Sequence, residues 1–362
     1  MTDRIKLLRA LLKEQGLPAI LINSAVNRRY LSGFTGGAGW LLITPEHAFL
    51  FTDSRYTLQA AAEAPAFSVH QVVNPGKTIA EWLVEVAAQY GIPEMGFEAA
   101  HTSFAEHADL SKNIAGVFVL RPVAGLVEQL RTIKDDAELA AMRKAIDLTD
   151  YVMETVIAQL RPEHSELDAA WMFEKALREG GAERPSFPII VAAGPNAAQA
   201  HHRPCDDKLG VGRSIIIDMG AHINGYNADL TRTIILGDAD ERFWTIYNTV
   251  LAAHQRAIDG VRAGVHAHEV DALARDYIAS AGYGDKFGHG LGHGIGMEVH
   301  EFPFVRWTSP GGTSPLIQPG VVTSIEPGIY IEGWGGVRIE DLVLVTAEGC
   351  EVLSHAAKIH QP

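Results

Sequence analysis

The chain has 362 residues, of which 47% are hydrophobic and 20% charged, and its formal net charge is −14 at pH 7. This length exceeds what one ordinary domain needs, so we expect two domains, each with a core of its own. An acidic protein lacks the basic face that nucleic acid or an anionic membrane surface requires, so neither is an expected partner.

The N-terminal segment, residues 1–22, predicts an amphipathic helix followed by a strand. It lacks the apolar core and cleavage site of a signal peptide, and no apolar run is long enough to span a bilayer. Cys205 and Cys350 are the two cysteines of the chain, and a large core makes a disulfide unnecessary. We therefore expect a cytoplasmic protein in a reducing compartment.

Helix-like and strand-like patterns alternate up to about residue 125, which predicts an α/β domain. The expected strands are 20–22, 40–43, 48–52 and 68–73, and the expected helices are 78–90 and 103–114. The glycine cluster at residues 33–39 precedes a strand rather than a helix, so it predicts a turn and not a nucleotide-binding loop. Arg55 has two candidate roles, a surface ion pair and a contact with a substrate or a partner subunit.

The pattern changes around residues 127–134, and we place the domain boundary between residues 128 and 129. Asp135 or Asp136, followed by Glu138, predicts the start of a long amphipathic helix that ends before Pro162. Further helices are expected at 165–178, 238–261 and 265–280. These helices alternate with two predicted hairpins, which suggests two related halves that close on a central site.

Residues 186–204 predict a strand followed by a loop that carries His201 and His202. Adjacent histidines in a loop are usually ordinary surface residues, but a position at a strand end just before an acidic hairpin favours a functional role. Cys205 follows closely, and metal ligation by its thiol is one interpretation. A single cysteine beside oxygen ligands is more often incidental, so we do not expect Cys205 to be a ligand.

Residues 214–233 predict a hairpin with an acid on each strand. An apolar run leads into Asp218, and Asp229 follows a turn at Asn224 and Gly225, which is the strongest short hairpin signal. The midpoint of the two aspartates lies within about a residue of this turn, so their carboxylates are expected close together. Two such anions repel, and they either share a proton or hold a cation.

The same arrangement recurs near the C-terminus, where Glu326 and Glu340 flank a glycine-rich turn centred on residue 333. The segment between the two hairpins, residues 287–303, carries three histidines: His289, His293 and His300. Four carboxylates and one imidazole form an oxygen-rich ligand set. Such a set suits two hard or borderline divalent ions, such as Mn²⁺, Co²⁺ or Zn²⁺.

Together these motifs resemble the metal-dependent pita-bread peptidase family, which contains prolidase, aminopeptidase P and methionine aminopeptidase. The matching stretches are HHRP (201–204), DMGAHINGYNADLTRT (218–233), GHGLGHGIGMEVHE (288–301) and SIEPGIYIEGWGGVRIED (324–341). Residues 27–37 and 51–60 resemble the N-terminal domain that prolidases and aminopeptidases P share. The resemblance implies an α/β (α+β) protein with a creatinase-like domain at 1–128, a pita-bread catalytic domain at 129–362, and a homodimer.

Carried over residue by residue, the resemblance implies two divalent ions per subunit, with Mn²⁺ preferred over Co²⁺ or Zn²⁺. The implied metal ligands are Asp218 for one ion, His293 and Glu326 for the other, and Asp229 and Glu340 as bridges. The implied substrate-binding residues are His201, His289, His300 and Arg338. The chain departs from the usual family residues at Ala193 and Ala200, which leaves the loop shape and the substrate preference open.

Arg338 has two candidate roles. Its planar guanidinium suits a substrate carboxylate, whereas the alternative is an ion pair that orients Glu340 or Asp341.

The function implied by the resemblance is metal-dependent hydrolysis of the peptide bond before proline in Xaa-Pro dipeptides, through a water that bridges two cations. Glu326 is expected to take the proton of this water, and His201 or His300 to contact the oxyanion or the leaving amine. The main alternative is an Xaa-Pro aminopeptidase that releases the N-terminal residue of longer peptides. A catalytically inactive binding module and a metal-free, creatinase-like hydrolase are less favoured.

Overall fold

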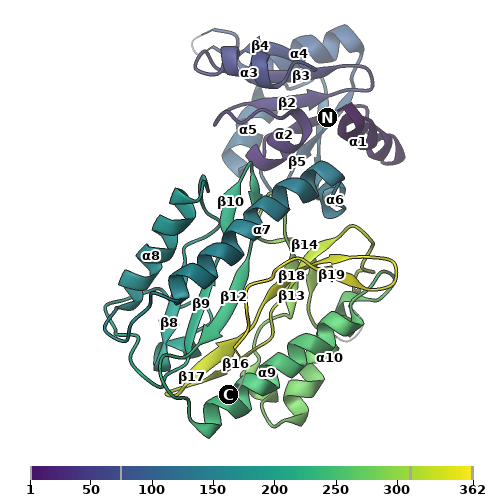
Figure 1. Ribbon diagram of the computed structural model, residues 1–362. Helices are drawn as coiled ribbons and strands as arrows, with labels where there is room; N and C mark the ends of the chain where they lie inside the picture. Colours follow the sequence, from purple (N-terminus) through teal and green to yellow (C-terminus); the bar gives the residue numbers. More distant parts are fainter. Residues whose placement is uncertain (1, 74–75, 310–311, 360–362) are drawn as a thin grey trace. The chain divides into compact units, whose positions relative to one another are not determined.

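The computed structural model describes residues 2–73, 76–309 and 312–359 of the chain. The chain forms two compact units, Met1–Arg131 and Thr132–Pro362, which run from purple to blue and from teal to yellow in Figure 1. The sequence analysis placed the boundary slightly earlier, inside helix α6 (Leu126–Thr132). None of the helices in the described ranges combines the length and the apolar composition needed to cross a bilayer.

The first unit is built on a six-stranded mixed sheet with the strand order β4-β3-β2-β1-β5-β6. The strands are β1 (Ile20–Ile22), β2 (Trp40–Ile43), β3 (Ala48–Thr52), β4 (Ser68–Gln71), β5 (Glu94–Glu98) and β6 (Val119–Val123). The other helices are α1 (Thr2–Glu14), α2 (Ala25–Ser32), α3 (Thr57–Glu63), α4 (Ile79–Tyr90) and α5 (Phe104–Asn113). β1, β2 and β3 pair antiparallel, whereas the pairs β3–β4, β1–β5 and β5–β6 are parallel.

The strands and helices predicted for this unit are confirmed to within two residues. Thr78 and Ser103 begin α4 and α5 with capping boxes, which satisfy backbone N–H groups that a helix start leaves without partners. β5 and β6 were not predicted from the sequence, because a glycine interrupts one and Pro122 the other. Arg55 is exposed and pairs with Asp53 at 2.8 Å.

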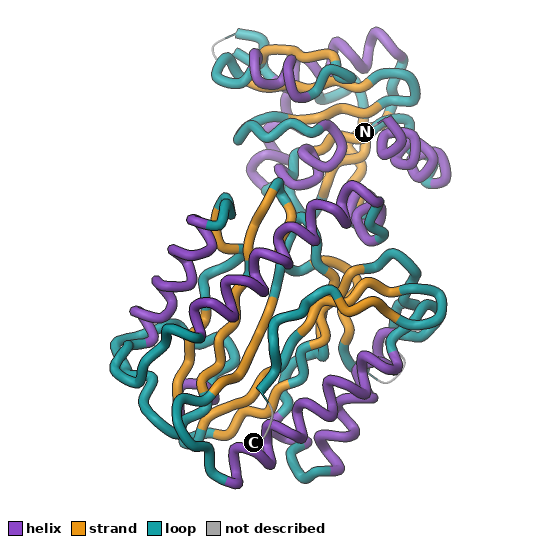
Figure 2. Tube along the Cα trace, in the orientation of Figure 1, coloured by secondary structure: helices purple, strands orange, loops and turns teal. Residues whose placement is uncertain are grey.

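The second unit places two pairs of helices around its strands, as Figure 2 shows. The pairs are α7 (Asp136–Ile157) with α8 (Glu166–Glu179), and α9 (Glu241–Gly260) with α10 (Ala267–Ser280). Asp135 caps α7 through a capping box, as predicted, and Ser165 caps α8 in the same way. The predicted chain order of helices, hairpin, helices and hairpin is confirmed.

The strands of this unit form several small sheets, which pair as β12-β9-β8, β11-β10-β7, β14-β13-β15-β18-β19 and β16-β17. The strands of the first half are β7 (Arg184–Pro185), β8 (Ile190–Ala193), β9 (Ile215–Met219), β10 (Ala221–Ile223), β11 (Tyr226–Asn227) and β12 (Leu230–Ile234). Those of the second half are β13 (Gly292–Gly294), β14 (Glu301–Val305), β15 (Val322–Ile325), β16 (Gly328–Ile331), β17 (Gly335–Arg338), β18 (Asp341–Val345) and β19 (Cys350–Val352).

Both predicted hairpins are present. In the first, Asp218 lies opposite Thr231, and the turn residues Asn224 and Gly225 have φ angles of 52° and 86°, as a type I′ turn requires. Asp229 lies two positions before Thr231 and therefore faces the same side of the hairpin as Asp218.

The second hairpin pairs its two acidic residues directly. Ile325 lies opposite Asp341, and Gly328 lies opposite Arg338. The register is the same on both sides of the gap, so Glu326 and Glu340 lie opposite each other between the paired segments.

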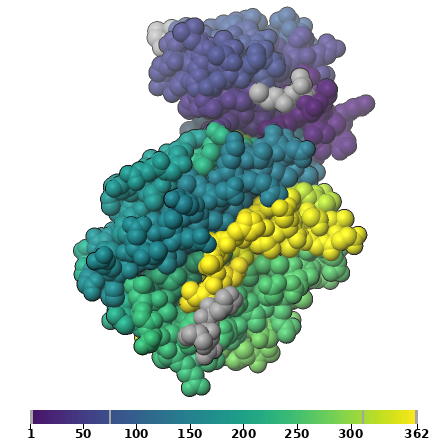
Figure 3. Space-filling view, viewed as in Figure 1, coloured from purple at the N-terminus to yellow at the C-terminus, as the bar shows by residue number. Residues whose placement is uncertain are grey.

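After β19 the chain crosses the surface between α7 and α9, where it is seen in yellow in Figure 3. The Asp150 carboxylate on α7 accepts hydrogen bonds from the backbone N–H groups of His355 and Ala356, at 2.6 and 3.0 Å. On the α9 side, the Ile359 N–H donates to the Tyr247 hydroxyl at 3.0 Å. These contacts fix the C-terminal segment on both sides.

Two glycines allow the strands that carry acids and histidine to approach closely. A Cβ atom at Gly220 would overlap the Ala228 carbonyl, and one at Gly292 would overlap the Ser324 carbonyl. Gly292 directly precedes His293, so the position of this imidazole depends on a backbone contact that only glycine permits.

We expect Gly292→Ala to lower the free energy of unfolding of the second unit by about 1–3 kcal/mol, because the added methyl group must push β13 and β15 apart. Gly288→Ala is the matched control, since a Cβ atom there meets no atom within 4 Å. Its effect should stay within about 0.5 kcal/mol. Urea denaturation followed by circular dichroism measures both, and equal stabilities would contradict the proposed close approach.

Candidate metal centre

Five side chains from separate strand ends of the second unit line one cavity of about 500 Å³: Asp218, Asp229, His293, Glu326 and Glu340. Asp218 belongs to β9 and His293 to β13, and the other three acids lie in short connections between paired strands. This volume is typical of a site for a small molecule. The structure thus brings together the residues that the sequence analysis proposed as ligands.

The imidazole of His293 faces two of the carboxylates. Its Nε2 atom lies 3.3 Å from Glu326 Oε1 and 3.7 Å from Asp229 Oδ2. Its Nδ1 atom lies 3.1 Å from the Gly294 carbonyl oxygen, to which Nδ1–H donates. A backbone acceptor at Nδ1 leaves Nε2 directed at the acids, which is the usual orientation of a histidine metal ligand.

Some oxygen atoms of the four carboxylates accept hydrogen bonds from the protein, and others do not. Thr231 Oγ1 donates to Glu340 Oε2 at 2.7 Å, and Arg338 Nη2 donates to Asp218 Oδ2 at 2.6 Å. The second oxygen atoms, Asp218 Oδ1 and Glu340 Oε1, are buried and have no hydrogen-bond partner among the described residues. Burying a carboxylate oxygen without a partner is costly, so these atoms fit a site for divalent cations.

The pKa values of the acids reflect their burial and their mutual repulsion. Burial, and then the neighbouring carboxylates, raise the pKa values of Asp229 and Glu340 well above their ordinary range. Burial would also raise the pKa of Glu326, but the hydrogen bond and charge of His293 outweigh it and lower this pKa to about 2. The acids cannot all ionise together without a countercharge, and divalent cations supply one.

Two further histidines predicted as substrate contacts border the acids. His201 is exposed and lines the cavity. The rings of His300 and His293 meet edge to face, with 4.3 Å between their centroids and 60° between their planes. Burial, and then the charges of His293 and His201, lower the pKa of His300. His300 is therefore neutral near pH 7, and both side chains are accessible from the cavity.

His289 also lines the cavity, but its nitrogen atoms contact other groups of the protein. Its Nδ1 lies 2.8 Å from the Gly290 carbonyl, and its Nε2 lies 2.8 Å from the Tyr330 hydroxyl. Burial lowers the pKa of His289, so the neutral ring donates from Nδ1 and accepts at Nε2. The Tyr330 hydroxyl in turn accepts from Arg338 Nη1 at 2.9 Å. This chain of hydrogen bonds fixes the imidazole.

The guanidinium of Arg338 is buried and contacts the protein on several sides. It binds Asp218 Oδ2 at 2.6 Å, the Ala200 carbonyl at 3.1 Å and the Tyr330 hydroxyl at 2.9 Å. The sequence analysis considered an ion pair with Glu340 or Asp341, but the observed partner is Asp218. These contacts favour a positioning role for Arg338 over recognition of a substrate carboxylate.

Sequence reasoning missed Tyr330, Arg203 and Arg306 near the site. Arg306 and Arg203 line the cavity and are exposed. Residues of β14 alternate between buried and exposed, and Phe304 and Arg306 continue its exposed side. This alternation was a signal that could have placed Arg306. No comparable pattern surrounds Arg203, which lies in a loop.

Comparisons with known proteins identify the family of this chain. A profile of metallopeptidase family M24 matches residues 140–347, and a profile of the creatinase/prolidase N-terminal domain matches residues 4–133. The Xaa-Pro dipeptidase of Pyrococcus horikoshii is 33% identical over 98% of this chain and 97% of its own length.

Solved structures are similar along both units. A structure of an Xaa-Pro dipeptidase from Bacillus anthracis is 37% identical, with a TM-score of 0.94, and the match covers 99% of this chain and 98% of that one. A structure of an X-Pro aminopeptidase from Thermotoga maritima is 33% identical, with a TM-score of 0.88, and covers 95% and 97%. These matches confirm the resemblance and the fold that the motifs predicted. The chain belongs to metallopeptidase family M24, with a pita-bread catalytic domain after a creatinase/prolidase N-terminal domain.

Proposed function

We propose that this peptidase hydrolyses the bond before proline in short peptides and prefers Xaa-Pro dipeptides, as the names of its relatives suggest. The observation that carries the proposal is the set of four carboxylates, three of them buried, and one imidazole, in which Asp218 Oδ1 and Glu340 Oε1 have no hydrogen-bond partner among the described residues. We assign two divalent ions to this set, with Mn²⁺ preferred. Asp218 would bind one ion, His293 and Glu326 the other, and Asp229 and Glu340 both.

Bound divalent ions supply Lewis-acid chemistry, which activates water and polarises the scissile carbonyl. Glu326 is the base in our proposal, because its carboxylate lies in the cavity, 3.3 Å from His293 Nε2. It takes one proton of the attacking water and passes it to the proline nitrogen as the peptide bond breaks. His201 and His300 stand on the cavity wall and donate hydrogen bonds to the oxygen that gains negative charge.

The cavity wall suits a proline residue with a free carboxylate. Its apolar part includes Phe187, Ile189 and Phe304, against which a ring without an N–H can pack. Its basic part includes Arg203 and Arg306, which have no ion pair among the described residues. Because Arg338 is occupied by Asp218, we assign recognition of the substrate carboxylate to Arg306, whose planar fork binds two oxygens.

Each alternative function would require different features of the same cavity. An Xaa-Pro aminopeptidase needs space beyond the proline and no partner for its carboxylate, and a relative with that name is 33% identical. An inactive binding module is disfavoured because all five proposed ligands are present. A metal-free, creatinase-like hydrolase would not need the partnerless oxygens of Asp218 and Glu340. We also keep a homodimer and a cytoplasmic location as proposals.

Substrate length tests the choice between dipeptidase and aminopeptidase. We expect the protein to cleave Xaa-Pro faster than Xaa-Pro-Xaa. Arg306→Gln should raise KM for the dipeptide by about 10- to 100-fold, because hydrogen bonds to a charged group contribute about 1.5–3 kcal/mol. The same variant should leave KM for the longer peptide nearly unchanged. Cleavage of only the longer peptides by the unaltered protein would establish the aminopeptidase instead.

Asp229→Asn should separate catalysis from folding. The raised pKa of Asp229 means that ionising it costs folded-state stability, and this cost appears as the pH rises above about 4, its ordinary pKa. Asparagine removes the cost, so the metal-free variant should be at least as stable at pH 7 as the metal-free parent. Its metal affinity should fall by more than about 100-fold and turnover with it. Elemental analysis, thermal unfolding and peptide hydrolysis test this, and wild-type metal content with full activity would refute the assignment.

Metal removal and pH provide an independent test. Chelation should abolish activity, and Mn²⁺ should restore it. Burial and the neighbouring acids raise the pKa values of Asp229 and Glu340, so protons compete with metal for these carboxylates, and metal affinity should fall as the pH is lowered. Calorimetry in buffers of different ionisation enthalpy measures the released protons. Full activity in protein without divalent ions would favour the creatinase-like alternative.

A further inference from the structure

Outside the catalytic centre, the described residues contain two more groups of His, Cys, Asp or Glu with donor atoms within 4.8 Å of one another. One is Glu98, His101 and Glu128 in the first unit, and the other is Glu166, His202 and Cys205 in the second. The two groups differ in how their donor atoms are already used.

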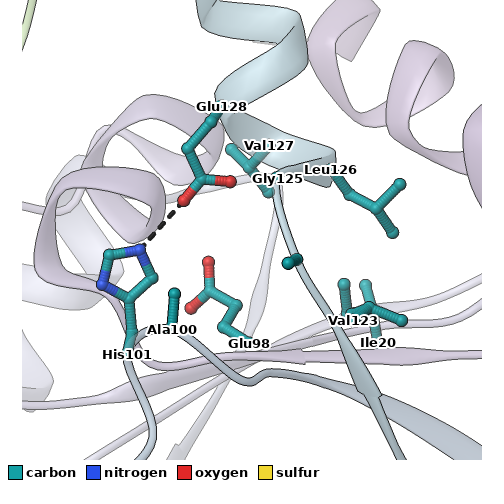
Figure 4. Close-up of a pocket in the computed structure, with 10 residues that line it drawn as sticks. Ile20, Glu98, Ala100, His101, Val123, Gly125, Leu126, Val127 and Glu128 are labelled. Atoms are coloured by element: carbon teal, nitrogen blue, oxygen red, sulfur yellow. Dashed lines mark hydrogen bonds and ion pairs between the residues drawn. The ribbon is translucent and has the colours of Figure 1, made fainter. Parts of the chain in front are cut away.

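The group in the first unit is held together by hydrogen bonds within the protein. Figure 4 shows His101 directed at Glu128, with Glu98 close to both. Glu98 Oε2 accepts from the backbone N–H of Ser24 at 2.8 Å, and Asn27 Nδ2 donates to both carboxylates at 2.6 and 2.7 Å. These donors occupy the carboxylates and fix the start of α2, which is a structural role.

The group in the second unit converges on one oxygen atom. Glu166 is the first residue of α8, and its side chain has 0% exposure. Its Oε2 atom lies 2.7 Å from His202 Nε2 and 3.2 Å from Cys205 Sγ. Its Oε1 atom is held separately, by the Ala193 N–H at 2.8 Å and by Asn196 Nδ2 at 3.0 Å. Oε2 also accepts from the Cys205 backbone N–H at 3.1 Å, so the carboxylate is fixed through both oxygens while Oε2 faces an imidazole and a thiol.

We propose that Glu166, His202 and Cys205 form a zinc site that is distinct from the catalytic centre. Bonds of about 2.0–2.3 Å to nitrogen, oxygen and sulfur place the ligand atoms of tetrahedral zinc roughly 3.3–3.7 Å apart. The observed separations of 2.7 and 3.2 Å from Glu166 Oε2 lie within about 1 Å of this geometry. Small rotations of the three side chains make room for the zinc ion between them, and a water supplies the fourth ligand.

The donor types distinguish this site from the catalytic centre. A thiolate and an imidazole favour Zn²⁺, whereas four carboxylates and one imidazole also suit the harder Mn²⁺. On binding, the Cys205 thiol loses its proton to solvent as the sulfur–zinc bond forms, and His202 binds through the Nε2 lone pair. Affinity therefore rises with pH. The Ala193 and Asn196 contacts to Glu166 Oε1 persist and keep the carboxylate oriented.

One loop connects the proposed zinc site to the catalytic cavity. His202 directly follows His201, and both line that cavity, whereas Cys205 does not. A zinc ion held by His202 and Cys205 would tie this loop to the start of α8. The loop that carries His201 would then have less freedom, while the five catalytic ligands would remain unchanged.

The test uses the full-length protein with its catalytic centre loaded with Mn²⁺. Co²⁺ is added as an optical probe, because a cobalt–thiolate bond gives a charge-transfer absorption band. The five residues of the catalytic centre include no sulfur, so this band reports a cysteine ligand. We expect the band to saturate at about one Co²⁺ per chain and to disappear when Zn²⁺ displaces the cobalt.

Two cysteine variants decide which thiol is responsible. Cys205→Ser keeps a hydrogen-bond donor for Glu166 and should abolish the band while leaving hydrolysis with Mn²⁺ unchanged. Cys350→Ser is the matched control, since the Cys350 thiol contacts the Ile258 carbonyl, and it should keep the band. His202→Gln provides a second variant and should weaken zinc binding by at least about 10-fold. Absence of the band in the unaltered protein, or its survival in Cys205→Ser, would overturn the proposal.

Discussion

The repulsion among four carboxylates in one cavity, three of them buried, is the constraint on which the rest of the second unit depends. Such groups separate or take up protons unless the backbone holds them together and a countercharge is present. Here two hairpins hold them, and the Glu340 N–H donates to the Thr231 carbonyl at 3.1 Å, which joins the second hairpin to the first. The position of the acids is thus set by backbone hydrogen bonds, which the charges cannot easily break.

The groups around the acids stabilise some of their oxygen atoms and leave others available. Arg338 neutralises one oxygen of Asp218, and Thr231 donates to one oxygen of Glu340, but the second oxygen of each has no hydrogen-bond partner in the described part of the chain. Arg338 also orients Tyr330, whose hydroxyl meets His289. The buried guanidinium of Arg338 therefore links Asp218, a proposed metal ligand, to His289 on the cavity wall, which explains why Arg338 is not free to bind substrate.

The sequence predicted those parts of the fold and site that depend on local patterns. The Asn224-Gly225 turn fixes the register of the first hairpin, and Glu326 and Glu340 lie symmetrically about the second turn, so their convergence could be predicted. The partner of Arg338 could not, because Asp218 is distant in the chain and the contact arises only when the two hairpins pack. The grouping of Glu166 with His202 and Cys205 likewise depends on how α8 meets a loop.

The C-terminal segment gives one more support to the catalytic residues. The Arg232 guanidinium donates to the Ala356 carbonyl at 2.6 Å and to the Glu340 carbonyl at 2.5 Å. Truncation before His355 would leave buried guanidinium donors without an acceptor and would also remove the backbone N–H partners of Asp150. Deleting this tail, or fusing another protein close to it, would therefore weaken the support of Glu340, a proposed metal ligand, although none of the described tail residues lines the cavity.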